Sequence, residues 1–318
     1  MGNSFCNTVS FCNKYFLYYL LRYSIKDIQS NTHGSVFDTI TRETFNVLDV
    51  SLPSLSEQKA IADVLSCLDD KIELNDRINK TLEEIAQAIF KSWFVDFEPF
   101  QDGGFEDSEL GRIPKGWRIV ELLEISTVQN GYAFKSTDYQ ENGCNMIRTT
   151  NIGSDGFVDN IDLVNLPFTF LMDTKYKNFR FSNLDTVLVM VGANVGKIGI
   201  ITEKNIPALQ NQNMWRFRPT HEGISTIYIH YYARLINERV RNWSSGSARD
   251  FYRKDSFQKV KCIYPTDDVM DNFQKTTQGI YNKISLNLIE NEALTTIRNI
   301  LLPKLMSGEI RVPLEEIK

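Results

Sequence analysis

One stretch dominates the sequence, because residues 54–98 have the pattern of a single helix much longer than a globular domain usually holds. Ser54 and Glu57 have the spacing of a capping box, and Pro99 disfavours helix in the residue before it, so we expect the helix to end at Phe97 or Glu98. At 1.5 Å per residue it would be about 65 Å long. Apolar and asparagine side chains alternate at spacings of four and three, which predicts a coiled-coil seam; a surface helix on a globular core is the alternative. This first seam comprises Leu68, Ile72, Asn75, Asn79, Leu82, Ala86, Ile89 and Trp93.

The chain also repeats itself, without a gap, after 212 residues. Pro53 falls on Pro265, and the two seam asparagines fall on two further asparagines. Two long helices whose polar layers have the same spacing would bury those amides best against each other, so we predict that they pack together as a pair. We expect the second helix over residues 268–307, with Gly308 just past its end and a kink or an early end at Pro303. The second seam comprises Ile280, Ile284, Asn287, Asn291, Leu294, Arg298, Leu301 and Leu305.

Between the helices, short strand-like runs are separated by Gly, Asn and Asp, which is typical of an irregular, mainly-β domain. The predicted fold class is α+β: this mixed domain with a small helical part over residues 224–242, flanked by the two helices. The predicted strands are 118–120, 145–148, 186–191, 197–202 and 214–218.

The repeat also divides the chain. We predict a remnant of a first domain over 1–53, the first helix over 54–98, a complete domain over 99–267, and the second helix with a tail over 268–318. The remnant should hold a short helix over 15–22, matching 227–234, and a strand or two around 44–52. By the same offset, the counterpart of residues 102–212 would lie before Met1.

Composition narrows the class of protein. Five cysteines without CxxC spacing and only three histidines predict reduced thiols in the cytoplasm and no metal site. The apolar run over 15–21 is too short to span a membrane. The net charge is −5, yet residues 130–265 hold 17 basic and 12 acidic side chains, and eight of the basic ones lie within 234–261. A basic segment inside an acidic chain is where a DNA footprint could sit.

No catalytic motif is convincing. In the segment VGANVGKIG (191–199), three residues separate Gly192 from Gly196, and Ile198 stands where a phosphate-binding loop needs Ser or Thr. A tight turn between two strands, with both glycines at positive φ, fits better. No N-P-P-Y or D-P-P-Y stretch is present, and no carboxylate pair with a downstream Lys suggests a nuclease. We therefore predict no cofactor.

The combination of motifs resembles a specificity subunit of a type I restriction-modification system. The resemblance covers most of the chain from residue 34 onward; in one respect it departs, because only the tail of a first recognition domain is present. It implies a non-catalytic subunit that reads DNA through target-recognition domains, with two antiparallel helices that dock methyltransferase subunits and, through the complex, restriction (translocase-nuclease) subunits. The carrying stretches are LPSLSEQKAIADVLSCLDDKIELN (52–75), GRIPKGW (111–117), NGYAFKSTDY (130–139), DTVLVMVGANVGKIGI (185–200), ALQNQNMWRFRP (208–219), GSARDFYRKDSF (246–257) and NILLPKLMSGEIRVP (299–313).

For reading DNA we expect amide and hydroxyl side chains to contact base edges and basic ones to contact phosphates. The candidates follow strand-like runs or lie in the most basic stretch; each could instead be an ordinary solvated or capping residue. They are Lys135, Ser136, Arg148, Thr149, Asn151, Asn211, Gln212, Ser247, Arg249, Arg253 and Lys254.

The sequence thus predicts a DNA-recognition subunit that reads one half-site of double-stranded DNA. Three alternatives stay open: a half-length subunit that forms a homodimer to read a symmetric split site, a truncated inactive copy, or a coiled-coil scaffold that does not bind DNA. The basic segment argues against a scaffold.

Overall fold

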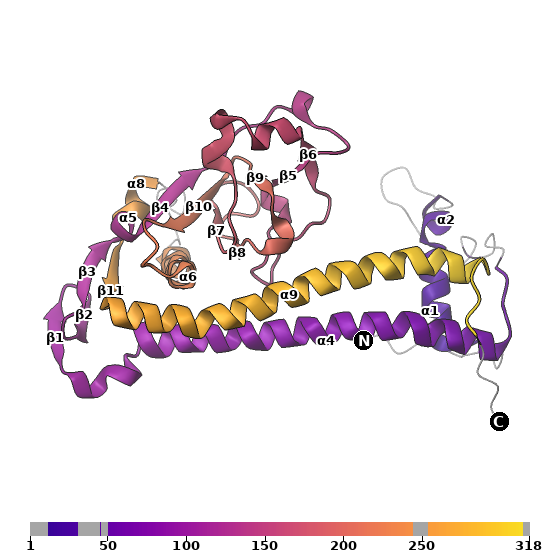
Figure 1. The fold of residues 1–318 in the computed structure, drawn as a ribbon, viewed down its shortest axis with the longest axis horizontal. Coiled ribbons are helices and arrows are strands. Elements are labelled where there is room, and N and C mark those ends of the chain that lie inside the picture. The colour runs from indigo at the N-terminus through magenta and orange to yellow at the C-terminus, as the bar shows by residue number, and fades with distance from the viewer. Residues whose placement is uncertain (1–11, 31–44, 46–49, 244–253, 314–318) are drawn as a thin grey trace. The chain divides into compact units, whose positions relative to one another are not determined.

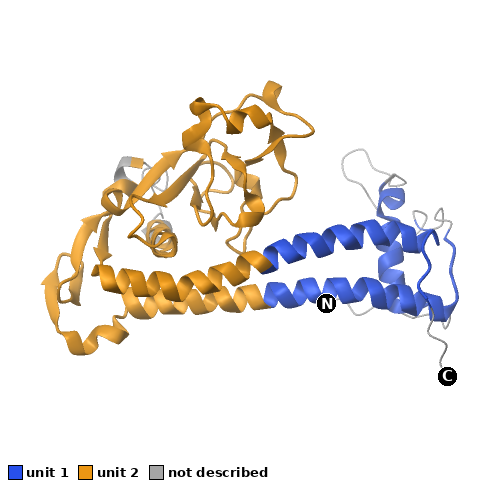
Figure 2. Cartoon of the chain, in the orientation of Figure 1, with its two compact units in different colours: residues 1–77, 287–318 blue, residues 78–286 orange. Residues whose placement is uncertain are grey.

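The computed structural model describes residues 12–30, 45, 50–243 and 254–313. The chain divides into two compact units, one made of residues 1–77 and 287–318 and the other of residues 78–286 (Figure 2). Two helices of 40 residues each, α4 (Leu55–Phe94) and α9 (Asp267–Met306), contribute one segment to each unit. We call the two parts unit 1 and unit 2.

Unit 1 is helical. Its short helices α1 (Lys14–Tyr23) and α2 (Ile25–Ser30) lie beside the first part of α4 and the last part of α9 (Figure 1). The Asn13 side chain accepts hydrogen bonds from the backbone N–H groups of Tyr15 and Phe16, which fixes the start of α1. Apolar side chains from α1, α4 and α9 form one core, so the helix predicted over 15–22 is confirmed. The buried core residues are Phe16, Tyr19, Leu20, Ile61, Ala62, Leu65, Leu302 and Leu305.

The predicted seam joins α4 to α9 in unit 1. Asn75 Nδ2 donates to Asn291 Oδ1 (2.9 Å), Asn291 Nδ2 donates to Asp76 Oδ1 (2.7 Å), and Arg298 pairs with Asp69. Rising residue numbers on α4 face falling residue numbers on α9, so the helices are antiparallel, as the resemblance implied. The partly buried seam residues in this unit are Leu68, Ile72 and Leu294, and Asn287 is buried.

In unit 2, the two helices meet through aromatic side chains. Phe94 and Phe273 lie edge to face with centroids 4.9 Å apart, and Phe90 also contacts Phe273. The seam residues Asn79 and Ile284 are buried here, and Leu82 is half-buried.

The rest of unit 2 holds small sheets, which confirms the mixed α+β class (Figure 1). A four-stranded antiparallel sheet has the order β4 (Ser126–Asn130), β10 (Met214–Pro219), β7 (Thr186–Val189), β8 (Ile198–Ile200). A three-stranded sheet has the order β6 (Val164–Leu166), β5 (Cys144–Ile147), β9 (Ala208–Gln210), with β5 and β9 parallel. Helix α6 (Thr226–Trp243) packs on β10 and β7.

Two two-stranded sheets and several short helices complete the unit. Strand β1 (Phe105–Ser108) pairs with β2 (Gly111–Pro114), and β3 (Arg118–Glu121) pairs with β11 (Lys261–Tyr264). The short helices are α5 (Leu122–Ile125), α8 (Lys254–Gln258) and the 3-10 turns Glu98–Gly103, Ser136–Asp138, Thr149–Asn151, Phe168–Leu171, Thr174–Phe179 and Glu203–Asn205.

Three predicted boundaries need comment. Helix α4 ends at Phe94, earlier than predicted, because Phe97 has a left-handed backbone (φ 57°) that starts the turn at Glu98. Helix α9 continues through Pro303 to Met306 instead of ending early, and Gly308 (φ 75°) lies just past its end, as predicted. The strand expected around residues 44–52 falls largely outside the described residues, and residues 50–52 are not in a strand.

Candidate nucleic-acid interface

The ends of three strands meet at one edge of unit 2. Asn211 N–H donates to the Ile147 carbonyl (3.1 Å), Tyr132 N–H donates to the Gln210 carbonyl (3.1 Å), and Gln212 N–H donates back to the Tyr132 carbonyl (3.0 Å). The chain after β9 therefore lies between the chain that leaves β5 and the chain that leaves β4. This places three predicted groups at neighbouring positions: Lys135 with Ser136, Arg148 with Thr149, and Asn211 with Gln212.

A glycine makes this close approach possible. A Cβ on Gly131 would lie 1.8 Å from the Asn211 carbonyl oxygen, a distance that no side chain tolerates. At the end of the turn between β9 and β10, Asn213 has a left-handed backbone (φ 70°), a conformation that Asn adopts more readily than most residues. The Asn211 side chain helps to hold this turn, because its Oδ1 accepts the Gln212 backbone N–H (2.8 Å). The exposed side chain of Gln212 is left for other contacts.

The glycine turn between β7 and β8 joins the same edge. Met190 N–H donates to the Asn213 carbonyl (3.2 Å), and Asn194 Nδ2 donates to the Thr149 carbonyl (3.4 Å). Gly192 and Gly196 have φ values of 94° and 80°, which confirms the predicted tight turn. We call the combined surface, residues 131–136, 148–150, 190–197 and 211–213, the recognition edge.

Two exposed lysines give the recognition edge a positive charge. Lys135 and Lys197 are exposed, and within the described part of the chain neither lies within ion-pair distance of a carboxylate. A third cation lies beside the edge: Lys175 Nζ is 5.3 Å from the centre of the Tyr132 ring and 4.9 Å from that of Tyr176, and these contacts raise the pKa of Lys175. Neither Lys175 nor Lys197 was among the DNA-binding candidates predicted from the sequence; both are recognised from their neighbours in space.

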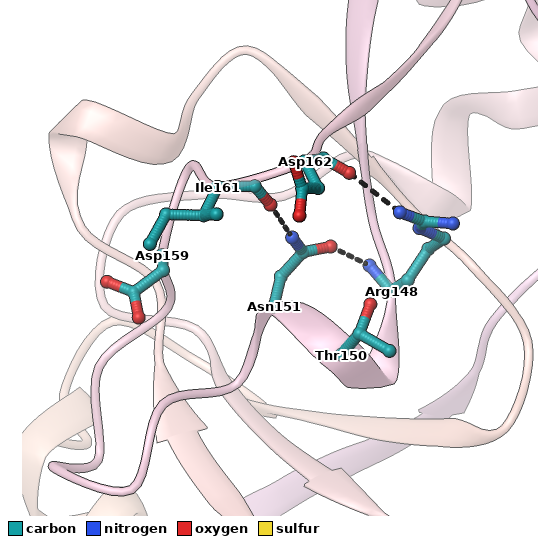
Figure 3. Close-up of a pocket in the computed structure, with 6 residues that line it drawn as sticks. All are labelled: Arg148, Thr150, Asn151, Asp159, Ile161 and Asp162. Atoms are coloured by element: carbon teal, nitrogen blue, oxygen red, sulfur yellow. Dashed lines mark hydrogen bonds between the residues drawn. The ribbon is translucent and has the colours of Figure 1, made fainter. Parts of the chain in front are cut away.

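A pocket of about 300 Å³ adjoins the edge (Figure 3). Asn151 is part of its wall and is 3% exposed. Its Oδ1 accepts from the Arg148 backbone N–H (2.9 Å), and its Nδ2 donates to the Ile161 carbonyl (2.7 Å). The amide of Asn151 is therefore occupied in holding this loop, and we no longer count it as a base-reading candidate. Burial raises the pKa of Asp159, another residue of the pocket wall.

The guanidinium of Arg148 is partly occupied in the same loop. Its Nη2 donates to the Asp162 carbonyl (2.6 Å), and the pocket wall also carries the Asp159 and Asp162 residues (Figure 3). Arg148 is therefore a weaker phosphate contact than its position after β5 suggested.

Comparison with known proteins identifies the family. Residues 2–84 and 114–286 match the model of the type I restriction modification DNA specificity domain. The chain belongs to this family. It is a DNA specificity subunit of a type I restriction-modification system, a component that is not itself catalytic.

Individual relatives agree with the assignment. The chain is 28% identical to the HindI specificity subunit of Haemophilus influenzae, over 88% of this chain and 73% of that protein. It is also 28% identical to the MjaIX specificity subunit of Methanocaldococcus jannaschii, over 93% of this chain and 69% of that protein. The crystal structure of a type I S subunit from M. genitalium has a similar fold, with a TM-score of 0.55 at 18% identity over 92% of this chain and 72% of that chain.

Some basic residues of the stretch 234–261 in this specificity subunit form ion pairs within the fold. Arg234 pairs with Glu83, and Lys261 lies 3.8 Å from Glu109 and 3.6 Å from Glu121, so both contribute to folding contacts. Lys254 is the first residue of α8 and is half-buried. The candidates Ser247, Arg249 and Arg253 lie outside the described residues.

Two arginines of β10 in this specificity subunit are engaged within the sheet: Arg216 is buried and Arg218 is half-buried. Arg218 binds Asp185 through two hydrogen bonds of 2.7 and 2.6 Å, and Arg216 Nε lies 3.9 Å from the same carboxylate. Burial lowers the pKa of Arg216 to about 10. These two arginines hold Asp185 directly before β7, so their guanidinium groups are occupied and do not serve the recognition edge.

The described residues contain no group of three His, Cys, Asp or Glu side chains that could hold a metal. Cys12, Cys67, Cys144 and Cys262 are free thiols. Over the ranges that the structure describes, every helix is too short or too polar to cross a membrane.

Proposed function

We propose that the recognition edge reads one half-site of a split DNA target from the major groove. What supports this is the meeting of three polar turns, from the ends of β4, β5 and β9, at one edge next to two exposed lysines. An exposed amide side chain such as that of Gln212 can form paired hydrogen bonds with adenine, and lysines contact phosphates without regard to sequence. In this proposal residues 99–267 are the recognition domain, double-stranded DNA is the ligand, and no cofactor takes part.

The two long helices would then be the spacer and the docking surface for modification subunits. Large apolar side chains are exposed at equivalent positions of both copies of the repeat: Leu74 (45%) matches Leu286 (61%), and Ile85 (45%) matches Ile297 (46%). Residues eleven apart on a helix share a face, so each helix carries one such pair. Exposed apolar side chains that recur in both copies support two equivalent contacts with methyltransferase subunits, and restriction subunits would join through that complex.

The seam itself does not need a second copy of the chain. Within one chain, Asn75 already bonds to Asn291, and Asp69 already pairs with Arg298. A homodimer formed through the same seam would have to break these contacts, so the proposal is built on a single chain with its modification subunits.

Selection from a randomised duplex pool, with the purified chain and its modification subunit, tests the half-site proposal. We expect enrichment of one short sequence. A palindromic pair at fixed spacing would instead indicate a homodimer, and no enrichment in an assembled complex would contradict the proposal.

Copurification tests the helix surface separately. The double variant Leu74→Lys/Ile85→Lys should fold, because both side chains are exposed, but should lose binding to the modification subunit. Glu73→Lys/Glu84→Lys, at the neighbouring exposed positions, is the matched control and should bind. Equal binding by both variants would overturn the docking surface.

A further inference from the structure

The turn between β7 and β8 exposes apolar side chains at the recognition edge. Val191 is 55% exposed, Val195 is 43% exposed, and Ala193 between them is also exposed. The structure describes every residue of the recognition edge, and these two valines are the only large apolar side chains exposed on it. One exposed valine on a surface is ordinary, whereas three exposed apolar residues within five positions form a local apolar patch. We call residues 191–195 the apolar tip.

Hydrogen bonds hold the apolar tip in one conformation. Gly196 N–H donates to the Val189 carbonyl (2.8 Å), and Val195 N–H donates to the Gly192 carbonyl (3.2 Å). From helix α6, Asn237 Nδ2 donates to the Gly196 carbonyl (3.0 Å), and Asn237 itself is 3% exposed. A valine side chain has a single rotatable torsion, so little conformational entropy is lost when a ligand covers it. The apolar tip is therefore preorganised for contact with an apolar group.

The groups beside the apolar tip fit DNA better than an apolar protein surface. Lys197, two residues after the tip, is exposed. Met190 N–H, just before the tip, donates to the Asn213 carbonyl (3.2 Å), and Asn213 follows the exposed Gln212 in the chain. A cation and an amide beside the tip favour a partner that presents phosphates, hydrogen-bonding groups and an apolar group together. The major groove of DNA does so, because thymine, alone among the four bases, presents a methyl group there.

From this we infer that Val191 and Val195 contact the 5-methyl group of thymine and so specify a T·A base pair in the half-site. The inference rests on the proposed function, because it requires the recognition edge to lie in the major groove. Contacts between lysines and phosphates are independent of sequence, whereas an apolar contact with the methyl group distinguishes thymine from the three other bases. The affinity for DNA should therefore depend on one methyl group while base pairing stays the same.

Replacing thymine by deoxyuridine tests the inference, since deoxyuridine lacks only the 5-methyl group and keeps the same base pair and phosphates. The duplex selected from the randomised pool, and versions in which each half-site thymine is replaced in turn, are titrated with the full chain bound to its modification subunit. Fluorescence anisotropy measures the affinity. We expect the affinity to fall about fourfold at one or two of these thymines, as for the loss of one buried methyl group. Unchanged affinity at every thymine, or a selected half-site without an A·T pair, would overturn the inference while the proposed function stands. Enrichment of no sequence at all would contradict both.

Two variants assign the methyl contact to the apolar tip. Val191→Ala/Val195→Ala should fold, because both side chains are exposed, and should bind the thymine and uracil duplexes with equal affinity, close to that of the parental chain for the uracil duplex. Val95→Ala is the matched control: Val95 is 39% exposed and lies outside the recognition edge, so this variant should keep the parental preference for thymine. An undiminished preference in Val191→Ala/Val195→Ala would show that another group contacts the methyl, and loss of the preference in Val95→Ala would show that the tip does not cause it. Either result contradicts the inference.

Discussion

The side-chain amide of Asn75, on α4, donates a hydrogen bond of 2.9 Å to the amide oxygen of Asn291, on α9. Asn75 is 1% exposed, so the pair lies inside the helix seam of unit 1. Asn75 also donates to Glu290 (2.8 Å) and accepts from Lys71 (3.0 Å), so both amide N–H groups and the amide oxygen have partners. A buried polar layer of this kind fixes the register of two helices, because any shift along the seam leaves buried groups without partners.

Replacing only one amide of this layer should therefore cost more than replacing both. Asn75→Leu leaves the Asn291 oxygen unpaired at the seam, and we expect the free energy of unfolding to fall by about 1–3 kcal/mol. Asn75→Leu/Asn291→Leu should recover more than half of that loss, since a leucine pair packs well at a seam. Urea unfolding measures both. A double variant no more stable than the single one would show that the amide pair does not fix the seam.

The carboxylate of Asp185 should be a second sensitive point. It is 1% exposed and binds Arg218 through two hydrogen bonds, with Arg216 at 3.9 Å. Asp185→Asn keeps the shape but removes the charge, which leaves Arg216 buried without compensation, and we expect a loss of about 3–5 kcal/mol. Glu222→Gln, at an exposed position, should leave the urea midpoint unchanged. Equal midpoints for both variants would refute the role of Asp185.

His230 should make the stability depend on pH. Burial holds its pKa well below the ordinary value of 6.5, so the folded chain keeps His230 neutral while the unfolded chain takes up a proton. The contribution of neutral His230 to the free energy of unfolding is therefore fully present well above pH 6.5, and it decreases as the pH falls below that value. At pH 5.5 we expect the free energy of unfolding to be about 1.4 kcal/mol lower than at pH 8 on this account. His230→Gln should lack this part of the pH dependence; an equally steep decrease in that variant would mean that other groups cause it.

The two long helices and their packing could be predicted from the sequence. The spacing of Asn75, Asn291 and the apolar seam residues predicted two long helices packed on each other, because a seam repeats over many turns and leaves a clear period. The turn at Gly192 and Gly196 was also predicted correctly, because glycine is the residue type that most readily adopts a positive φ.

Side-chain roles at the candidate site were harder to predict, because they depend on neighbours distant in the sequence. Asn151 looked like a base-reading amide but is buried and bonded to Arg148 and Ile161. Arg218 and Arg216 add to the basic count, yet Asp185, more than 30 residues earlier, engages both. Lys197 lies in the glycine segment 191–199, which was considered only as a phosphate-binding loop, and its place at the recognition edge follows from the fold.

Gln212 should contribute to specificity more than to general affinity. Its side chain is exposed at the recognition edge, while its backbone N–H is already bonded to Tyr132. If it reads one base pair, Gln212→Ala should relax selection at one position of the half-site and cost about 1–3 kcal/mol on the selected sequence. Binding to unrelated duplexes should stay the same. Sequencing of enriched pools from the two proteins compares them directly; an unchanged preference at every position would remove Gln212 from the reading surface.

The salt dependence of DNA affinity tests the recognition edge most directly. Each lysine that contacts a phosphate adds about 0.9 to the slope of log affinity against log salt. With the modification subunit present, Lys135→Ala/Lys197→Ala should lower that slope by about 2 and weaken binding to all duplexes alike. Lys115→Ala/Lys275→Ala, which removes two exposed lysines far from the edge in sequence, should keep the parental slope. An unchanged slope and affinity for Lys135→Ala/Lys197→Ala would contradict the assignment of this edge to DNA.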